Sequence, residues 1–221
     1  DHSHAYIAMA CMREGKHVYV QKPIAHSVFE ARRLTEGARE FKVVSQMGNQ
    51  GHSGEGIRQI CEWIDAGFIG HVREAHAWTN RPIWPQGINR PPSKPVPAHL
   101  DWDLWLGPAP WRPYNSAYVA GKWRGQYDFE SGARLLDWGA HTVDLCQWAN
   151  NADGTTPIEF EPSPIGITCR YANGVKLFLD FLKTPFGDRS PNWNTKLGLC
   201  PVKFVGSEGS VEVGDDGIEI K

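Results

Sequence analysis

The sequence has little that would mark a membrane, nucleic-acid-binding or disulfide-stabilised protein. Among its 221 residues no apolar run is long enough to span a bilayer, so we expect a soluble protein. The formal net charge is only -2, which gives no reason to expect nucleic acid or a membrane as a partner. Five cysteines are scattered without a C-x-x-C pair, which excludes a zinc knuckle or disulfide framework and favours buried free thiols.

A glycine-rich phosphate-binding loop is also missing. The segment from Gly48 to Gly54 matches neither G-x-G-x-x-G nor the P-loop spacing. We expect its polar residues Asn49 and Gln50 to touch a nicotinamide or a substrate, with a plain turn as the alternative. The chain begins at Asp1 within a helical pattern, so we expect the N-terminus of the protein to be missing. The compartment stays open: cytoplasm is favoured, but an export signal would precede Asp1.

Residues 1–70 show the alternation of helix and strand that is typical of a doubly wound α/β sheet. Apolar spacing and flanking glycines predict helices over 4–14, 27–40 and 55–66, and strands over 18–20 and 43–47. The second of these helices begins with a capping box, Ser27 with Glu30. We therefore interpret 1–70 as part of a Rossmann-type dinucleotide-binding domain.

Residues 71–221 predict a second domain of the α+β class, with an open, mostly antiparallel sheet and one helix packed on it. Strands are expected over 72–79, 165–171, 175–181, 202–205 and 210–213, with a hairpin at Asn173-Gly174. The helix is expected over 135–150. Nine of the sixteen prolines fall within residues 81–113, which predicts a long loop that forms the wall of a site.

Lys22 is the first candidate catalytic residue. It follows the short apolar strand 18–20 and precedes Pro23, which favours an extended, stiff turn. Ligands of doubly wound sheets gather at the carboxyl ends of strands, so an amine at this place can take part in proton transfer. From the tripeptide Gln21-Lys22-Pro23 alone, a solvated loop lysine is the simpler interpretation.

Asp137 and His141 form the second candidate group. They stand four residues apart in a helical pattern, which places both on one helix face with Asp144 one turn further. A carboxylate bonded to one ring nitrogen would fix the imidazole tautomer and leave the other nitrogen for a substrate hydroxyl. A polar helix face with a structural histidine is the alternative.

A metal site is a weaker possibility. Residues 1–4 include the pair His2 and His4 in an H-x-H arrangement, but the sequence shows no second cluster of ligands. We therefore expect no metal.

In combination, these segments resemble the Gfo/Idh/MocA oxidoreductases, the family of glucose-fructose oxidoreductase and inositol dehydrogenase. The similarity runs through the whole chain and is carried by the motifs D-H-S-H at 1–4, G-K-H-V-Y-V-Q-K-P at 15–23, W-D-L-W-L-G-P at 102–108 and D-W-G-A-H-T-V-D at 137–144. Gln21 stands where the family usually has glutamate, which removes a negative charge beside Lys22.

The resemblance implies NAD or NADP as cofactor, a carbohydrate or polyol substrate and a homo-oligomer formed through the C-terminal sheet. It implies Lys22, Asp137 and His141 as the catalytic set, with Lys22 and His141 converging on one carbon. The expected cofactor-binding residues are His4, Gln21, Lys22, Asn49 and Gln50. The expected substrate-binding residues are Trp123, Arg124 and Asp144.

We therefore expect an oxidoreductase that moves a hydride between a hydroxyl carbon and NAD(P), with the activity in the full-length parent. Three other functions stay open. They are an NAD-retaining glycosidase that works by transient oxidation and elimination, a non-catalytic dimerisation module, and a metal hydrolase.

Overall fold

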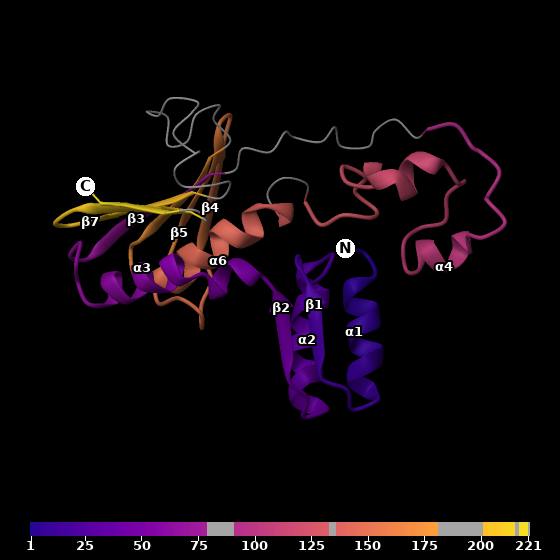
Figure 1. Ribbon diagram of the computed structural model, residues 1–221, viewed down its shortest axis with the longest axis horizontal. Coiled ribbons are helices and arrows are strands. Elements are labelled where there is room, and N and C mark those ends of the chain that lie inside the picture. Colours follow the sequence, from indigo (N-terminus) through magenta and orange to yellow (C-terminus); the bar gives the residue numbers. More distant parts are fainter. Residues whose placement is uncertain (79–90, 133–135, 181–200, 215–216, 221) are drawn as a thin grey trace. The chain divides into compact units, whose positions relative to one another are not determined.

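The computed structural model describes residues 1–78, 91–132, 136–180, 201–214 and 217–220 (Figure 1). They form two compact units. The first contains residues 1–48 and the later chain up to Asp137, and the second contains the described chain from Asn49 to Trp78 and from Trp138 onward. This division differs from the boundary near residue 70, because the helix that follows residue 54 packs on the sheet of the second unit.

The first unit opens with an α/β segment made of α1 (His4–Arg13), β1 (Val18–Gln21), α2 (Val28–Glu40) and β2 (Ser45–Gly48). The two strands are parallel, with Val18 opposite Ser45 and Gln21 opposite Gly48. Alanine, leucine and methionine side chains of both helices form the core together with β1. These elements confirm the doubly wound interpretation of this part of the chain.

The capping box at the start of α2 is present. Oγ of Ser27 accepts a hydrogen bond from the backbone N–H of Glu30 at 3.2 Å, and the Glu30 carboxylate accepts from the backbone N–H of Ser27 at 3.0 Å. Two N–H groups that the helix itself cannot satisfy thus have partners, and they fix where α2 begins.

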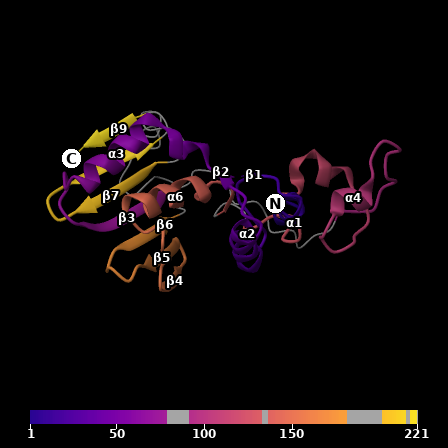
Figure 2. The same cartoon turned by 90° about the horizontal axis from the view of Figure 1, so that it is seen from below.

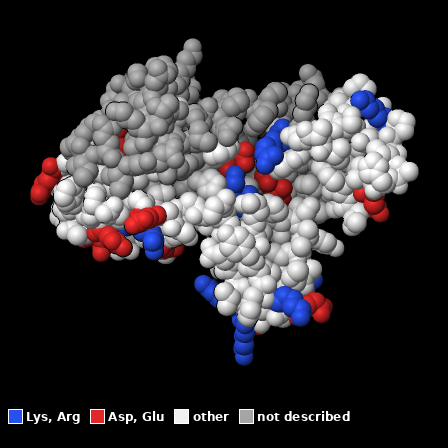
Figure 3. Space-filling view, viewed as in Figure 1, with Lys and Arg blue, Asp and Glu red and all other residues white. Residues whose placement is uncertain are grey.

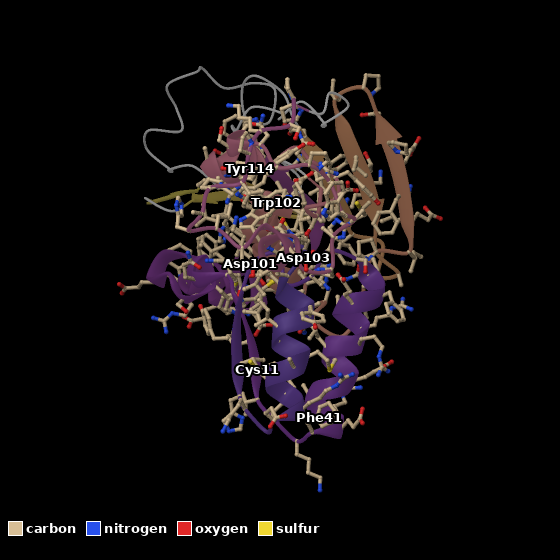
Figure 4. The ribbon with its side chains drawn as sticks, turned by 90° about the vertical axis from the view of Figure 1, so that its right-hand side faces the viewer. Cys11, Phe41, Asp101, Trp102, Asp103 and Tyr114 are labelled. Carbon is tan, nitrogen blue, oxygen red and sulfur yellow. The ribbon has the colours of Figure 1, made fainter. Side chains whose placement is uncertain are left out.

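Residues 91–132 have a core of their own, although the sequence predicted a long loop through residue 113. Asp101 caps the helix α4 (Trp102–Leu106), because its carboxylate accepts from the N–H of Leu104. A wide helical turn, η2 (Tyr118–Lys122), follows. Trp102 meets Tyr114 edge to face, with the ring centroids 5.2 Å apart. Figure 4 labels both residues in this segment. The buried cluster consists of Trp102, Leu106, Tyr114, Tyr118 and Phe129. Five large apolar side chains thus stabilise this proline-rich segment.

The second unit is built on a seven-stranded sheet of order β4-β5-β6-β3-β7-β8-β9. Its strands are β3 (Val72–Trp78), β4 (Glu159–Ser163), β5 (Gly166–Arg170), β6 (Lys176–Asp180), β7 (Val202–Gly206), β8 (Ser210–Gly214) and β9 (Gly217–Ile220). Among these strands only β3 and β6 pair in parallel. The sheet is therefore mixed and mostly antiparallel, which confirms the α+β expectation.

Two helices cover one face of this sheet, where the sequence predicted one. They are α3 (Glu55–Asp65) and α6 (Gly139–Ala149), and both lie on the same side of the strands (Figures 1 and 2). Ile60 and Ile64 of α3 share a core with Leu145 of α6 and with the strands. Of the predicted free thiols, Cys61, Cys146 and Cys169 are buried, Cys11 is half-buried, and Cys200 lies outside the described residues.

Candidate active site

Lys22 is the residue that directly follows β1. Its backbone N–H donates to Oε1 of Gln21 at 2.8 Å, and the Lys22–Pro23 peptide bond is cis. The Nζ atom donates to Oδ1 of Asp137 at 2.8 Å and also to the backbone carbonyl of Asp137. The two side chains are only 14% and 16% exposed. The first unit thus joins two of the predicted catalytic residues in a largely buried ion pair.

Arg124 is the second cation beside Asp137. Its Nε lies 3.4 Å from Oδ2 of Asp137, and its guanidinium carbon lies 4.3 Å from the centre of the Trp123 ring. Each carboxylate oxygen of Asp137 therefore faces a positive group. The Trp123 ring attracts the Arg124 guanidinium by a cation–π interaction. The structure thus places two predicted substrate-binding residues beside the Lys22–Asp137 pair.

His4 belongs to the same neighbourhood. Its Nδ1 lies 2.6 Å from the carbonyl oxygen of Pro23, so Nδ1 carries the proton and Nε2 is left as an acceptor. Burial lowers the pKa of His4 below 6.5, and the hydrogen bond to Pro23 opposes that shift. A neutral imidazole thus adjoins the turn of Gln21 and Lys22, two of the other residues expected to bind the cofactor.

His141 lies in the first turn of α6, in the second unit. A Cβ atom built at Gly51 would lie 3.9 Å from Nδ1 of His141, so the backbone of the short helix η1 (Gln50–Ser53) passes close to this ring. The helix α6 begins at Gly139, so Asp137 precedes it. The sequence predicted one helix that carries both Asp137 and His141. That Asp137 orients His141 stays a prediction.

Asn49 and Gln50 are at the start of η1. Asn49 is buried, and its carbonyl oxygen accepts from the N–H of His52 at 2.9 Å. The structure therefore places both expected cofactor-binding residues on the segment that passes beside His141.

Asp144 has a partner that the sequence did not reveal, His52. Oδ2 of Asp144 accepts from Nδ1 of His52 at 2.7 Å, and the His52 ring stacks on Trp148 at 4.0 Å with an angle of 7° between the planes. The sequence predicted that the polar loop 48–54 touches a nicotinamide or a substrate, but no spacing rule links His52 to a residue 92 positions later.

Among the described residues on the face drawn in Figure 3, charged side chains are spread in small groups, with no large patch of one sign. The described ranges contain no cluster of three or more histidine, cysteine or acidic residues arranged to hold a metal ion. Across those same ranges, no helix is long and apolar enough to cross a bilayer.

These features define a class: an α/β segment with polar side chains at the carboxyl end of its first strand, joined to an α+β domain, as in dinucleotide-dependent oxidoreductases. The chain belongs to the Gfo/Idh/MocA oxidoreductase family. Residues 57–180 match the model described as "Oxidoreductase family, C-terminal alpha/beta domain", and residues 1–49 match "Oxidoreductase family, NAD-binding Rossmann fold". The family thus confirms the resemblance and, at the level of the family, the expected enzyme class and the NAD or NADP cofactor.

Solved structures show the same fold. The WlbA dehydrogenase from Bordetella pertussis, in complex with NADH and UDP-GlcNAcA, matches with a TM-score of 0.63 at 18% identity, over 99% of this chain and 59% of that chain. GenD2 from gentamicin A biosynthesis, in complex with NAD, matches with a TM-score of 0.61 at 20% identity, over 96% of this chain and 51% of that one.

An NAD binding oxidoreductase from Klebsiella pneumoniae matches with a TM-score of 0.62 at 18% identity, over 99% of this chain and 54% of that chain. The chain thus spans between 51% and 59% of the length of these three structures. A comparison with curated protein sequences gives no significant match.

Proposed function

We propose that the protein that contains this chain oxidises a hydroxyl carbon of a sugar, polyol or glycoside with NAD or NADP. The observation that carries the proposal is the largely buried pair of Lys22 and Asp137 at the carboxyl end of β1. A buried ammonium is costly unless it is paired with an opposite charge. Buried ionisable pairs of this kind occur frequently in active sites. The sugar-nucleotide in the WlbA structure supports a carbohydrate as the substrate class.

The residues of the first unit fit the nicotinamide end of a dinucleotide. His4 offers Nε2 as an acceptor for a ribose hydroxyl, and the turn of Gln21 and Lys22 lies where ligands of doubly wound sheets bind. The sequence contains no glycine fingerprint for the pyrophosphate, so the fit is restricted to this end. When bound, the nicotinamide supplies the acceptor for the hydride.

The chain's own residues would handle the proton. In the proposed reaction the hydroxyl proton passes to an imidazole nitrogen of His141, and the Lys22 ammonium donates a hydrogen bond to the substrate oxygen. Asp137 would hold that ammonium in place through its carboxylate and its backbone carbonyl. Convergence of Lys22 and His141 on one carbon stays a prediction, as does a homo-oligomer through the C-terminal sheet.

The test uses protein expressed from the complete coding sequence. Reduction of NAD and NADP would be followed by absorbance with a panel that includes D-glucose, myo-inositol and UDP-glucose. We expect Lys22→Met to lower kcat/KM by about 10²–10⁴-fold, the usual contribution of a positioned acid or base. Lys16→Met, at an exposed lysine near the same strand, is the matched control.

Three outcomes would count against the dehydrogenase. Glycoside cleavage without net reduction of the cofactor would favour the NAD-retaining glycosidase. Turnover that is unchanged in both Lys22→Met and a His141→Ala variant would favour a non-catalytic module. Chelator-sensitive hydrolysis without a nicotinamide requirement would favour a metal hydrolase.

A further inference from the structure

His52 is held by two side chains of one helix face. Asp144 and Trp148 are four residues apart on α6, and both contact the His52 ring. The stack on Trp148, with ring centroids 4.0 Å apart, fixes the plane of the imidazole. The hydrogen bond to Asp144 fixes its rotation within that plane. A side chain with both constraints has lost its rotamer freedom before any ligand binds.

The acceptor also fixes the tautomer of His52. Because the Asp144 carboxylate can only accept, Nδ1 of His52 is the donor, and in the neutral ring Nε2 then carries a lone pair. The His52 side chain is 41% exposed. Its partners in the described part of the chain are Asp144, Trp148 and the Asn49 carbonyl, and none of them uses Nε2. The imidazole thus keeps an oriented acceptor for a ligand.

His141 lies beside this group. Asp144 is one helical turn after His141, and Gly51, the residue before His52, adjoins the His141 ring. The second unit therefore brings η1, the segment that carries His52, close to the His141 ring of α6. A sugar ring or a cyclic polyol carries hydroxyl groups on neighbouring carbons, so one hydroxyl can reach Nε2 of His52 while the next lies toward His141.

We propose that His52 is a substrate-binding residue whose Nε2 accepts a hydrogen bond from a hydroxyl neighbouring the carbon that is oxidised, with Asp144 and Trp148 as its positioning residues. This inference rests on the proposed function. It changes the role of Asp144, which the sequence predicted as a direct substrate contact and which here acts through His52.

The first test observes the histidine itself. In the protein from the complete coding sequence, labelled with ¹⁵N-histidine, NMR should show the Nδ1–H tautomer for His52. Addition of D-glucose, myo-inositol or UDP-glucose in the presence of NAD should shift its Nε2 resonance. If none of the three shifts it, or if a sugar binds and Nε2 does not respond, the proposal is wrong.

Two matched variants separate substrate binding from support of the fold. His52→Asn retains an amide that can reach Asp144 but removes the acceptor at the Nε2 position, whereas the longer His52→Gln places an amide near it. We expect His52→Asn to weaken sugar binding about tenfold, the value of one hydrogen bond, with NAD affinity unchanged and a smaller loss in His52→Gln. Equal sugar affinity in wild type and both variants would overturn the proposal.

The positioning role has its own measurement. Asp144→Ala should leave His52 in a mixture of tautomers, and Asp144→Glu should restore the Nδ1–H form in part. A purely structural Asp144 would change unfolding and leave the tautomer as it is, which contradicts the proposed role.

The two proposals can fail separately. A His52 shift on addition of sugar, without cofactor reduction for any panel member, would support the binding role and remove the dehydrogenase. Cofactor reduction with a His52 that does not respond would retain the dehydrogenase and remove the binding role.

Discussion

The Nζ atom of Lys22 lies 2.8 Å from Oδ1 of Asp137, although the two residues are 115 positions apart in the sequence. The ion pair connects the residue after β1 with the last residue of the first unit. A contact of this kind links a candidate site to the stability of the fold that carries it.

A double-mutant cycle with Lys22→Met and Asp137→Asn should therefore give a coupling free energy of about 1–3 kcal/mol in urea unfolding, because both side chains are largely buried. The matched control is the exposed pair Arg33 and Glu36 on α2, for which we expect about 0.3–0.5 kcal/mol. Equal coupling in the two cycles would mean that the first pair is no more than a surface contact.

Phe129 should be the side chain on which the aromatic core of residues 91–132 depends most. It is 0% exposed, meets Trp105 and Tyr118 edge to face at 5.0 and 5.4 Å, and lies 4.5 Å from the Arg112 guanidinium carbon. We expect Phe129→Ala to lower the free energy of unfolding by about 3–5 kcal/mol.

The control for this change is Trp111→Ala, since Trp111 is 70% exposed. Its effect should stay within about 0.5 kcal/mol. Urea unfolding followed by far-UV circular dichroism measures both free-energy changes, because tryptophan fluorescence would itself change in Trp111→Ala. A loss below about 1 kcal/mol for Phe129→Ala would show that the cluster contributes little.

Gly206, at the end of β7, is required by a close approach of two backbone segments. A Cβ at this position would lie 2.0 Å from the carbonyl oxygen of Ile69, which is backbone and cannot rotate away. We expect Gly206→Ala to destabilise the protein by about 1–3 kcal/mol, as overpacking does. Gly154→Ala is the control, because a Cβ there meets no atom within 4 Å, and thermal unfolding of the two variants compares them directly.

Stability should fall in mild acid through His2 and His4. Burial lowers the pKa of each below 6.5, and hydrogen bonds to the carbonyl oxygens of Trp105 and Phe129 for His2, and of Pro23 for His4, oppose the shift. Below pH 6.5 the unfolded chain therefore binds more protons than the folded one. The contribution of His2 and His4 to the free energy of unfolding is complete above pH 6.5. It is lost as the pH falls from there through their pKa values in the folded protein.

Urea unfolding at a series of pH values from 8 to 5 measures this dependence. The His4→Gln variant should reduce the slope below pH 6.5, and the same replacement at the exposed His99 is the surface control. A slope in His4→Gln equal to that of the wild type would contradict the assignment to His4.

Local rules predicted much of the fold. The Asn173-Gly174 signal correctly predicted the hairpin of β5 and β6, in which Arg170 pairs with Lys176. The capping box correctly placed the start of α2. Both signals depend on residues within a few positions of each other, which is the range over which turn and cap chemistry acts.

Features that depend on tertiary packing were not predicted. The strand β4 has five exposed residues and contains Pro162, so it shows no alternation of apolar and polar positions. The apolar face of α3 fits a doubly wound domain as well as the sheet on which it packs. The pairing of His52 with Asp144 could not be predicted, because only the fold brings these two residues together.

The strand β4 is an edge strand of the seven-stranded sheet, and its composition affects what can pair with that edge. Glu161 adds negative charge there, Glu159 is paired with Arg170 of β5, and Pro162 has no N–H to offer to another strand. Such an edge repels the addition of a foreign strand, which protects the sheet from open-ended polymerisation on this side.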